Sequence, residues 1–99
     1  MFNMASIKEH CQDCVKELGK PYREVHVWLD KLFVLMGPKH RQARHHKRGL
    51  EEALKLFGEE GRKAAEIHLK KDWESDFDHI PDDWEVEHWY IETYLGVRE

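Results

Sequence analysis

Residues 39–57 read KHRQARHHKRGLEEALKLF and join a basic, histidine-rich segment to a helical pattern. The first eleven residues hold five Lys or Arg, three His and no acid. The side chains of one buried helix face then recur every three or four positions, at Ala43, His46, Leu50, Ala53, Leu54 and Phe57. The stretch predicts a helix that runs to Phe57 and stops at Gly58, with His46 facing inward.

The same period predicts four more helices, over residues 7–18, 22–36, 61–72 and 84–95. Ser6 and Glu9 form a capping-box pattern before the first of these helices, and Gly19 ends it. Asp82 or Asp83 can cap the last one. We expect an all-α protein, a compact bundle of about five helices, with residues 1–99 in a single domain.

The spacing also predicts which side chains of the first and last helices face the core. In the first helix the predicted buried stripe is Ile7, Cys11, Cys14, Val15 and Leu18. In the last helix it is Trp84, His88, Ile91 and Leu95.

Length and charge limit the classes of function. The chain has 99 residues, enough for one core, and its apolar runs are too short to cross a bilayer. With no signal-peptide pattern at the N-terminus, we expect a cytoplasmic protein without a membrane partner. Residues 1–71 carry 15 basic and 10 acidic side chains, whereas residues 72–99 carry one basic and 10 acidic. This acidic end can fold back on the basic segment or pair with a second copy, and it argues against nucleic-acid binding.

Within the predicted helices, histidine and aspartate occur twice at a spacing of four, as His26 with Asp30 and His68 with Asp72. Each pair lies one turn apart on one side of a helix. Side chains that converge from facing helices are how helical bundles hold metal ions. Together with the central histidines they predict a site for a divalent transition metal, Zn, Fe, Mn or Ni, with the ligands His26, Asp30, His45, His46, His68 and Asp72. An error of one residue in register exchanges His45 and His46, so which of them faces inward stays open.

Charged residues close in sequence to the predicted ligands suggest that the metal site could be catalytic. Arg41 and Arg44 are predicted to hold an anionic group, and Glu66 is the candidate general base. The predicted function is that of a small metal-binding protein, extending to a metal-dependent hydrolase of a phosphate-bearing small molecule or nucleotide. Because a pocket in so short a chain would need a second subunit, we expect a homodimer. Whether the protein is an enzyme stays open.

A non-catalytic interpretation competes with the metal site. His and Asp one turn apart can bond simply to each other, and a buried His/Arg cluster can be a polar core that fixes helix register. The protein would then be an interaction module, with Trp73, Trp89 or Tyr90 exposed to a partner protein.

Cys11 and Cys14 form a lone CxxC, which is either half of a metal site shared across a dimer or two small helix residues.

The order of the polar residues resembles a protein family. The pattern His-Arg-x-x-Arg-His-His at residues 40–46 is its most specific part, and the resemblance covers about residues 10–84. It is similar to a group of small bacterial and phage proteins known only as a domain of unknown function. The resemblance implies one shared polar centre made of His10, His26, Asp30, His40, Arg41, Arg44, His45, His46, Glu66, His68 and Asp72.

The chain departs from that pattern at a few positions. Leu54 stands where the pattern has an acid, and Cys11 and Cys14 stand where it has small residues. A looser similarity, to the helical metal-dependent phosphohydrolases with adjacent His-Asp ligands, is an analogy only. Those proteins place His directly before Asp, whereas this chain has His45 followed by His46.

Overall fold

Helices make up all the regular structure of residues 6–96, the part of the chain that the computed structural model describes. The all-α class predicted from the sequence is therefore confirmed. Four helices have eight or more residues: α1 (Ile7–Leu18), α2 (Arg23–Asp30), α5 (Lys47–Trp73) and α6 (Asp83–Tyr90). The shorter elements are α3 (Phe33–Met36), the 3₁₀ turn η1 (Gly37–His40), α4 (Arg41–Arg44) and the π-helical turn η2 (Ile91–Leu95).

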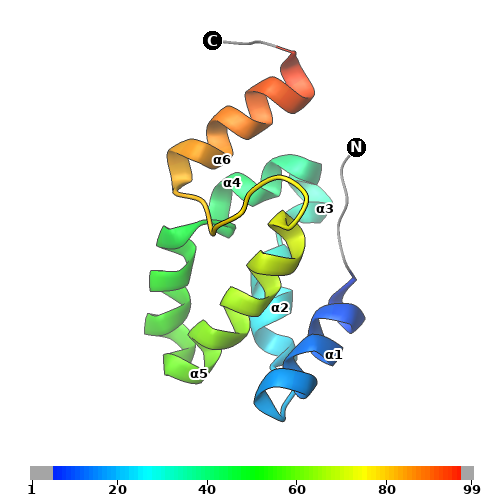
Figure 1. Cartoon of the computed structure of the whole chain (residues 1–99), viewed down its shortest axis with the longest axis vertical. Coiled ribbons are helices and arrows are strands. Elements are labelled where there is room, and N and C mark those ends of the chain that lie inside the picture. The colour runs from blue at the N-terminus through cyan, green and yellow to red at the C-terminus, as the bar shows by residue number, and fades with distance from the viewer. Residues whose placement is uncertain (1–5, 97–99) are drawn as a thin grey trace.

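The count of about five helices is corrected by the shape of α5. This element is bent at Gly58, where φ is 77° and ψ is −173°, a conformation that is almost exclusive to glycine. The predicted fourth helix is the second arm of this one hairpin, and the first arm is the part of the predicted third helix from Lys47 onward; Figure 1 shows the arms in green and yellow-green. The earlier part of the predicted third helix was wrong, because residues 37–44 form η1 and α4. Gly58 was predicted to stop a helix, and the structure places the bend there.

The predicted helix over residues 22–36 was wrong in its second half. Helix α2 ends at Asp30, and a turn at Lys31 separates it from the single turn α3. The apolar run continues through this break, but Val34 is 90% exposed and Leu35 is 83% exposed. These two side chains lie beyond the edge of the core, so burial does not hold the segment in line with α2.

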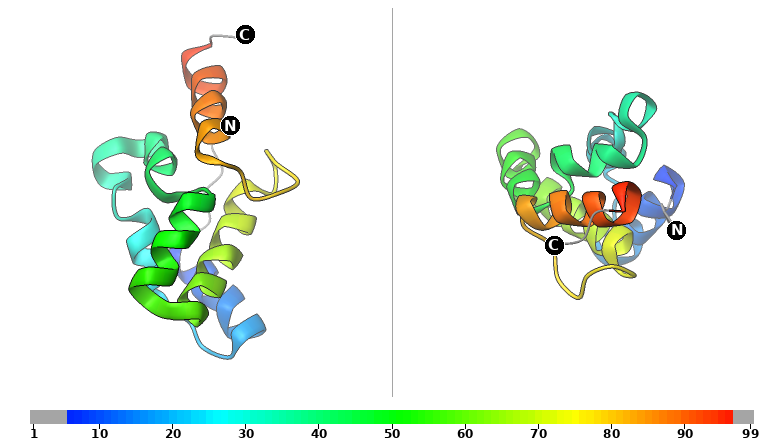
Figure 2. Two further views of the ribbon diagram at one scale, coloured as in Figure 1. Left: turned by 90° about the vertical axis from the view of Figure 1, so that its left-hand side faces the viewer. Right: turned by 90° about the horizontal axis from the view of Figure 1, so that it is seen from above.

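The core lies between α1, α2 and both arms of α5, and these three helices all contact one another. Figure 2 shows in its left view how the two arms of α5 meet at the bend. Helix α1 begins at the predicted capping box, where Glu9 N donates to Ser6 Oγ at 3.1 Å, and it ends at Gly19. Its buried face is formed by His10 and Cys14, one turn apart. The predicted stripe was therefore partly wrong, since Val15 is exposed and a histidine takes a core position.

Helix α6 lies against α4 and extends away from the α1 and α2 end of the molecule (Figure 1). Asp82 is its N-cap, as predicted, and Val86 is its buried residue. The predicted buried stripe was wrong, because Trp84 is 58% exposed and Leu95 is also exposed. The helix touches the bundle along one short edge, so its apolar period does not mark a core face.

The acidic end folds back on the basic segment within one chain. Lys47 Nζ lies 3.6 Å from Asp82 Oδ1, and Arg48 NH1 lies 2.9 Å from Asp83 Oδ2. All four side chains are well exposed, so each pair adds little to stability. One of the two predicted arrangements of the acidic end, folding back on the basic segment, is thus present in the structure.

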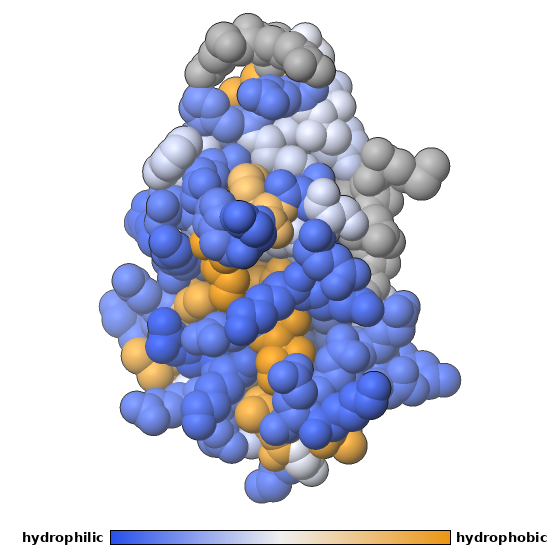
Figure 3. Space-filling view, in the orientation of Figure 1, coloured by the Kyte–Doolittle hydropathy of each residue, from blue (hydrophilic) through white to orange (hydrophobic). Residues whose placement is uncertain are grey.

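Hydrophilic residues cover most of the face shown in Figure 3, with a narrow band of apolar side chains down its middle. Among the described helices, none is both long and apolar enough to span a membrane.

Candidate metal centre

Two aspartates occupy the middle of a buried histidine cluster. Asp30 is the last residue of α2, and Asp72 lies in the last turn of α5. His45 Nε2 lies 3.2 Å from Asp30 Oδ1 and 3.2 Å from Asp72 Oδ2. His68 Nε2 has the same two neighbours, again at 3.2 Å each. Two nitrogens and two oxygens thus alternate around a closed ring.

The size of this ring suits a transition-metal ion. An ion at the centre of this ring would be equally distant from all four atoms. Its distance to each would be about 2.0–2.3 Å, depending on how far the ring is puckered, and zinc–nitrogen and zinc–oxygen bonds have similar lengths. The four ligand atoms lie within 4.8 Å of one another. Asp30, His45, His68 and Asp72 could therefore hold a metal ion without large movement.

Two more histidines flank the ring, one beside each carboxylate. His40 Nε2 lies 3.4 Å from Asp30 Oδ1, and His10 Nε2 lies 3.2 Å from Asp72 Oδ1. The His10 ring also stacks on the ring of His68, with 3.6 Å between centroids. The cluster therefore offers four imidazoles and two carboxylates, the ligand types of Zn, Fe, Mn and Ni.

The hydrogen bonds around His26 determine where the lone pair of His68 points. His26 Nε2 lies 3.0 Å from the Pro21 carbonyl oxygen, which can only accept, so Nε2 carries the proton. Burial, followed by the nearby His68 and His10, lowers the pKa of His26 to about 4, so its ring is neutral and Nδ1 accepts. His68 Nδ1, 3.0 Å away, must then donate. The lone pair of neutral His68 therefore lies on Nε2, facing both carboxylates.

His40 is oriented in the same way by its own turn. Its Nδ1 lies 2.7 Å from the Gly37 carbonyl oxygen and donates to it. In neutral His40 the lone pair lies on Nε2, the atom nearest Asp30. Such hydrogen bonds from the far ring nitrogen to a carbonyl or another base are the usual support of metal-binding histidines.

The corner between α4 and α5 decides which of the two adjacent histidines joins the cluster. Gly49 passes so close to the Arg44 carbonyl that a Cβ at this position would overlap it. At this corner His46 is the N-cap of α5, accepting at Nδ1 from Gly49 N at 3.3 Å. The carbonyl of His45 accepts from Trp73 Nε1 at 2.9 Å, which fixes the residue before the cap. The structure places His45 in the cluster and His46 outside it.

The ionised form of both central carboxyls is favoured where the surrounding histidines carry a proton toward them. Burial by itself would raise the pKa of Asp30, but His40, His45 and His68 lower that pKa well below its usual range. Burial would likewise raise the pKa of Asp72, and His10, His45 and His68 lower it. The centre thus contains two negative charges that are almost completely withdrawn from water, since the Asp30 side chain is only 10% exposed.

The predicted anion-binding arginines are engaged elsewhere. The Arg41 guanidinium is buried, lies 4.5 Å from the centroid of Trp73, and donates to the Asp72 carbonyl oxygen at 3.1 Å. Arg44 lies 4.5 Å from the Trp28 ring centroid and donates to the Trp28 carbonyl oxygen at 2.7 Å. Both arginines join helices through carbonyl groups and tryptophan rings.

Two other sequence-predicted positions lie outside the cluster. Glu66, the candidate general base, forms an ion pair with Arg62 at 3.8 Å on the outer side of α5. Leu54, which stands where the resemblance has an acid, is exposed on the first arm of the same helix. The structure thus leaves Glu66 without a contact to the ring of four ligand atoms among the described interactions, and a missing acid at Leu54 takes nothing from the cluster.

His10 and His40 were left out of the predicted ligand set although both belong to the motif. The structure places each of them beside a carboxylate, His10 next to Asp72 and His40 next to Asp30. The sequence signal that could have identified His10 was its four-residue spacing from Cys14, because these are the two buried residues of α1. His26, predicted as a ligand, lies 3.0 Å from His68 and forms with His10 and His68 a second group of buried side chains that could hold a metal ion.

Comparison with known protein families then places the chain. Residues 5–92 match the family described as a domain of unknown function, DUF6915. The chain belongs to this family. The match spans nearly the whole chain and every residue of the cluster, and it confirms the membership expected from the resemblance. Neither the curated proteins nor the solved structures gave a match.

Proposed function

We propose that this protein binds one divalent transition-metal ion through Asp30, His45, His68 and Asp72. His10 and His40 complete the surroundings of the ion, each beside one carboxylate oxygen. His26 acts as the support of His68 rather than as a ligand. The ion is Zn, Fe, Mn or Ni, because the donors are imidazole nitrogens and carboxylate oxygens.

The orientation of His68 carries this proposal. In the neutral ring, its Nε2 lone pair faces two carboxylates at 3.2 Å each. A lone pair and two anions in a buried space repel one another strongly. A divalent cation at their centre reverses that repulsion, and its charge balances the two aspartates, so the centre as a whole becomes neutral.

The burial of the centre favours a closed site over a hydrolytic one. Catalytic metal sites keep one coordination position open to substrate, whereas structural sites are enclosed by protein ligands. Here the histidines of the cluster are buried and the Asp30 side chain is 10% exposed. The predicted hydrolase would also need Arg41 and Arg44 to leave their carbonyl partners. We therefore propose metal binding that stabilises the fold, and not phosphoester hydrolysis.

All the proposed ligands come from a single chain. The homodimer expected from the sequence was needed to complete a pocket, and this centre does not require it. The dimer stays a separate prediction, tested by the mass of the protein in solution.

Elemental analysis of the untagged protein tests the proposal. After reconstitution with Zn, Fe, Mn or Ni in turn, we expect close to one ion per chain for at least one metal. Asp72→Asn and His45→Gln should each lose the ion while the far-UV circular dichroism stays helical. His79→Gln, in the exposed loop before α6, is the matched control and should keep it.

The competing interpretation predicts a different result. In a purely polar core, a second proton on His68 takes the place of the ion, and the aspartates are paired with imidazolium groups. The protein would then contain no metal after any reconstitution, and Asp72→Asn would unfold it with or without metal present. Either result would overturn the metal site.

A further inference from the structure

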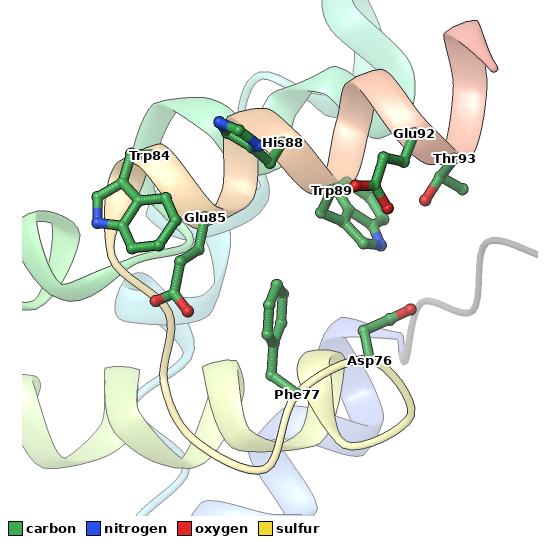
Figure 4. Close-up of a pocket in the computed structure, with 8 residues that line it drawn as sticks. All are labelled: Asp76, Phe77, Trp84, Glu85, His88, Trp89, Glu92 and Thr93. Atoms are coloured by element: carbon green, nitrogen blue, oxygen red, sulfur yellow. The ribbon is translucent and has the colours of Figure 1, made fainter. Parts of the chain in front are cut away.

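A second site lies outside the histidine cluster, between α6 and the loop that precedes it. The loop and the helix border an open cavity of about 290 Å³. Figure 4 shows the rings of Phe77, Trp84 and Trp89 around this space. Trp84 is 58% exposed, an unusual position for so large an apolar side chain in a cavity wall.

Two of the three aromatic walls are fixed in place by the core. Trp73, the largest buried side chain, meets the Phe77 ring edge-on at 5.1 Å between centroids. It meets the Trp89 ring in the same way at 4.8 Å. Edge-to-face contacts of this kind restrict ring rotation. The cavity is therefore formed before any ligand arrives.

Negative charge surrounds these rings. Asp76, Glu85 and Glu92 line the cavity, and none of its lining residues is Lys or Arg. Glu85 is held by the backbone N–H of Asp82, which donates to its Oε2 at 2.8 Å, and this hydrogen bond lowers the pKa of Glu85. In Figure 4 the carboxylates of Glu85 and Glu92 lie at opposite ends of the space.

We infer that this cavity binds an organic cation, an ammonium or guanidinium group carried by a small molecule or by a Lys or Arg side chain. Aromatic faces attract cations through the ring quadrupole, and the carboxylates add a direct charge interaction. An anion would meet the carboxylates of Asp76 and Glu92, while that of Glu85 is shared with His79 Nε2 at 2.9 Å, and a neutral apolar ligand would have to desolvate these groups. Trp89 already takes part in one such contact, with the Arg41 guanidinium 5.2 Å from its ring centroid.

The indole N–H groups provide a direct test. ¹⁵N-labelled protein is titrated with choline at constant ionic strength, and in parallel with 3,3-dimethylbutan-1-ol, the uncharged analogue of the same shape. We expect saturable shifts of the Trp84 and Trp89 indole resonances with choline, and much smaller shifts with the alcohol. The Trp28 indole, which packs beside Phe57, should not move.

Two variants locate the binding. Trp84→Ala and Glu92→Gln both change exposed side chains, and each should weaken choline binding by about fivefold or more, the size of one cation–π or charge contact. Glu51→Gln, an exposed carboxylate on the first arm of α5, is the control and should leave the affinity unchanged. Equal responses to choline and the alcohol, no saturable shift, or full binding by Trp84→Ala would each overturn the inference.

The source of the cation is decided by two further probes, Nα-acetyl-lysine amide and Nα-acetyl-arginine amide. If either binds more tightly than choline, the natural ligand is a basic side chain of a partner protein. If choline binds more tightly, the ligand is a free alkylammonium compound. The titration does not depend on an ion at the histidine cluster, so its outcome is independent of the proposed metal site.

Discussion

The direction of one lone pair on His68 depends on its neighbour His26. In His26→Leu the acceptor for His68 Nδ1–H is lost, so His68 can turn or change tautomer. We expect metal affinity to fall about 10- to 100-fold, as is typical when the support of a metal-binding histidine is removed. Competition with a chromophoric chelator measures the change.

The matched variant His26→Asn separates this effect from simple loss of packing. An asparagine side chain can place an oxygen near the original Nδ1 and accept the same hydrogen bond. Its metal affinity should lie closer to that of the natural protein than that of His26→Leu does. Equal losses in both variants would show that His26 acts through packing alone.

Cys14 lies behind the same histidine and should be chemically inert. Burial, more than its acidic neighbours, raises the pKa of the Cys14 thiol to about 11, because the thiolate is poorly solvated there. At any pH well below 11 the group stays protonated. A thiol reagent at pH 8 should modify Cys11, which is partly exposed, and reach Cys14 only after unfolding. Fast labelling of both thiols in the folded protein would contradict this environment.

Sequence reasoning reached part of the cluster and missed part for identifiable reasons. A spacing of four residues correctly suggested that His68 and Asp72 point the same way, because that is a local property of a helix. It could not show that His10 reaches Asp72, a contact between residues far apart in the chain. It also could not separate His45 from His46, because a cap and not a helix face decides between them.

The hairpin form of α5 depends on Gly58. Its φ and ψ lie in a region that side chains with a Cβ rarely adopt, and no neighbouring atom would touch an added Cβ. Gly58→Ala should therefore lower the free energy of unfolding by about 1–3 kcal/mol through backbone strain alone. Urea denaturation measures it, with Glu59→Ala, an exposed neighbour, as the control. A stability equal to that of the control would mean that the bend tolerates other residues.

Helix ends were more predictable than helix faces. The capping box of Ser6 and the stop at Gly19 are short-range signals that the structure has, and Gly58, also predicted as a stop, is the bend inside α5. The predicted buried faces of α6 and of residues 31–36 were wrong. A periodic run of apolar residues shows only which side of a helix could be buried. Whether another element covers that side depends on tertiary packing, and Trp84 and Val34 are left mostly exposed.

At the scale of the whole molecule, the proposed ion would connect residues from several elements, of which α1, α2 and α5 also pack on one another. His10 comes from α1, Asp30 from α2, His40 from η1, His45 from the corner before α5, and Asp72 from the end of α5. Without the ion, the two buried carboxylates repel each other and the fold is weakened.

Removing the metal should therefore destabilise the protein. Free metal at about 100 times its Kd should add about 2.7 kcal/mol to the free energy of unfolding, and EDTA should remove that gain. Thermal denaturation followed by circular dichroism, with and without chelator, measures the difference. Asp72→Asn should show no response to either treatment, and a response equal to that of the natural protein would place the ion elsewhere.

The bend at Gly58 divides the cluster as well as the helix. A chain cut at this exposed turn would leave Asp30, His40 and His45 on one fragment and His68 and Asp72 on the other. Neither fragment holds the full ligand set. Reassembly of the two halves would then depend on the divalent ion as a cross-link, which would make the protein a natural framework for a metal-controlled complementation pair.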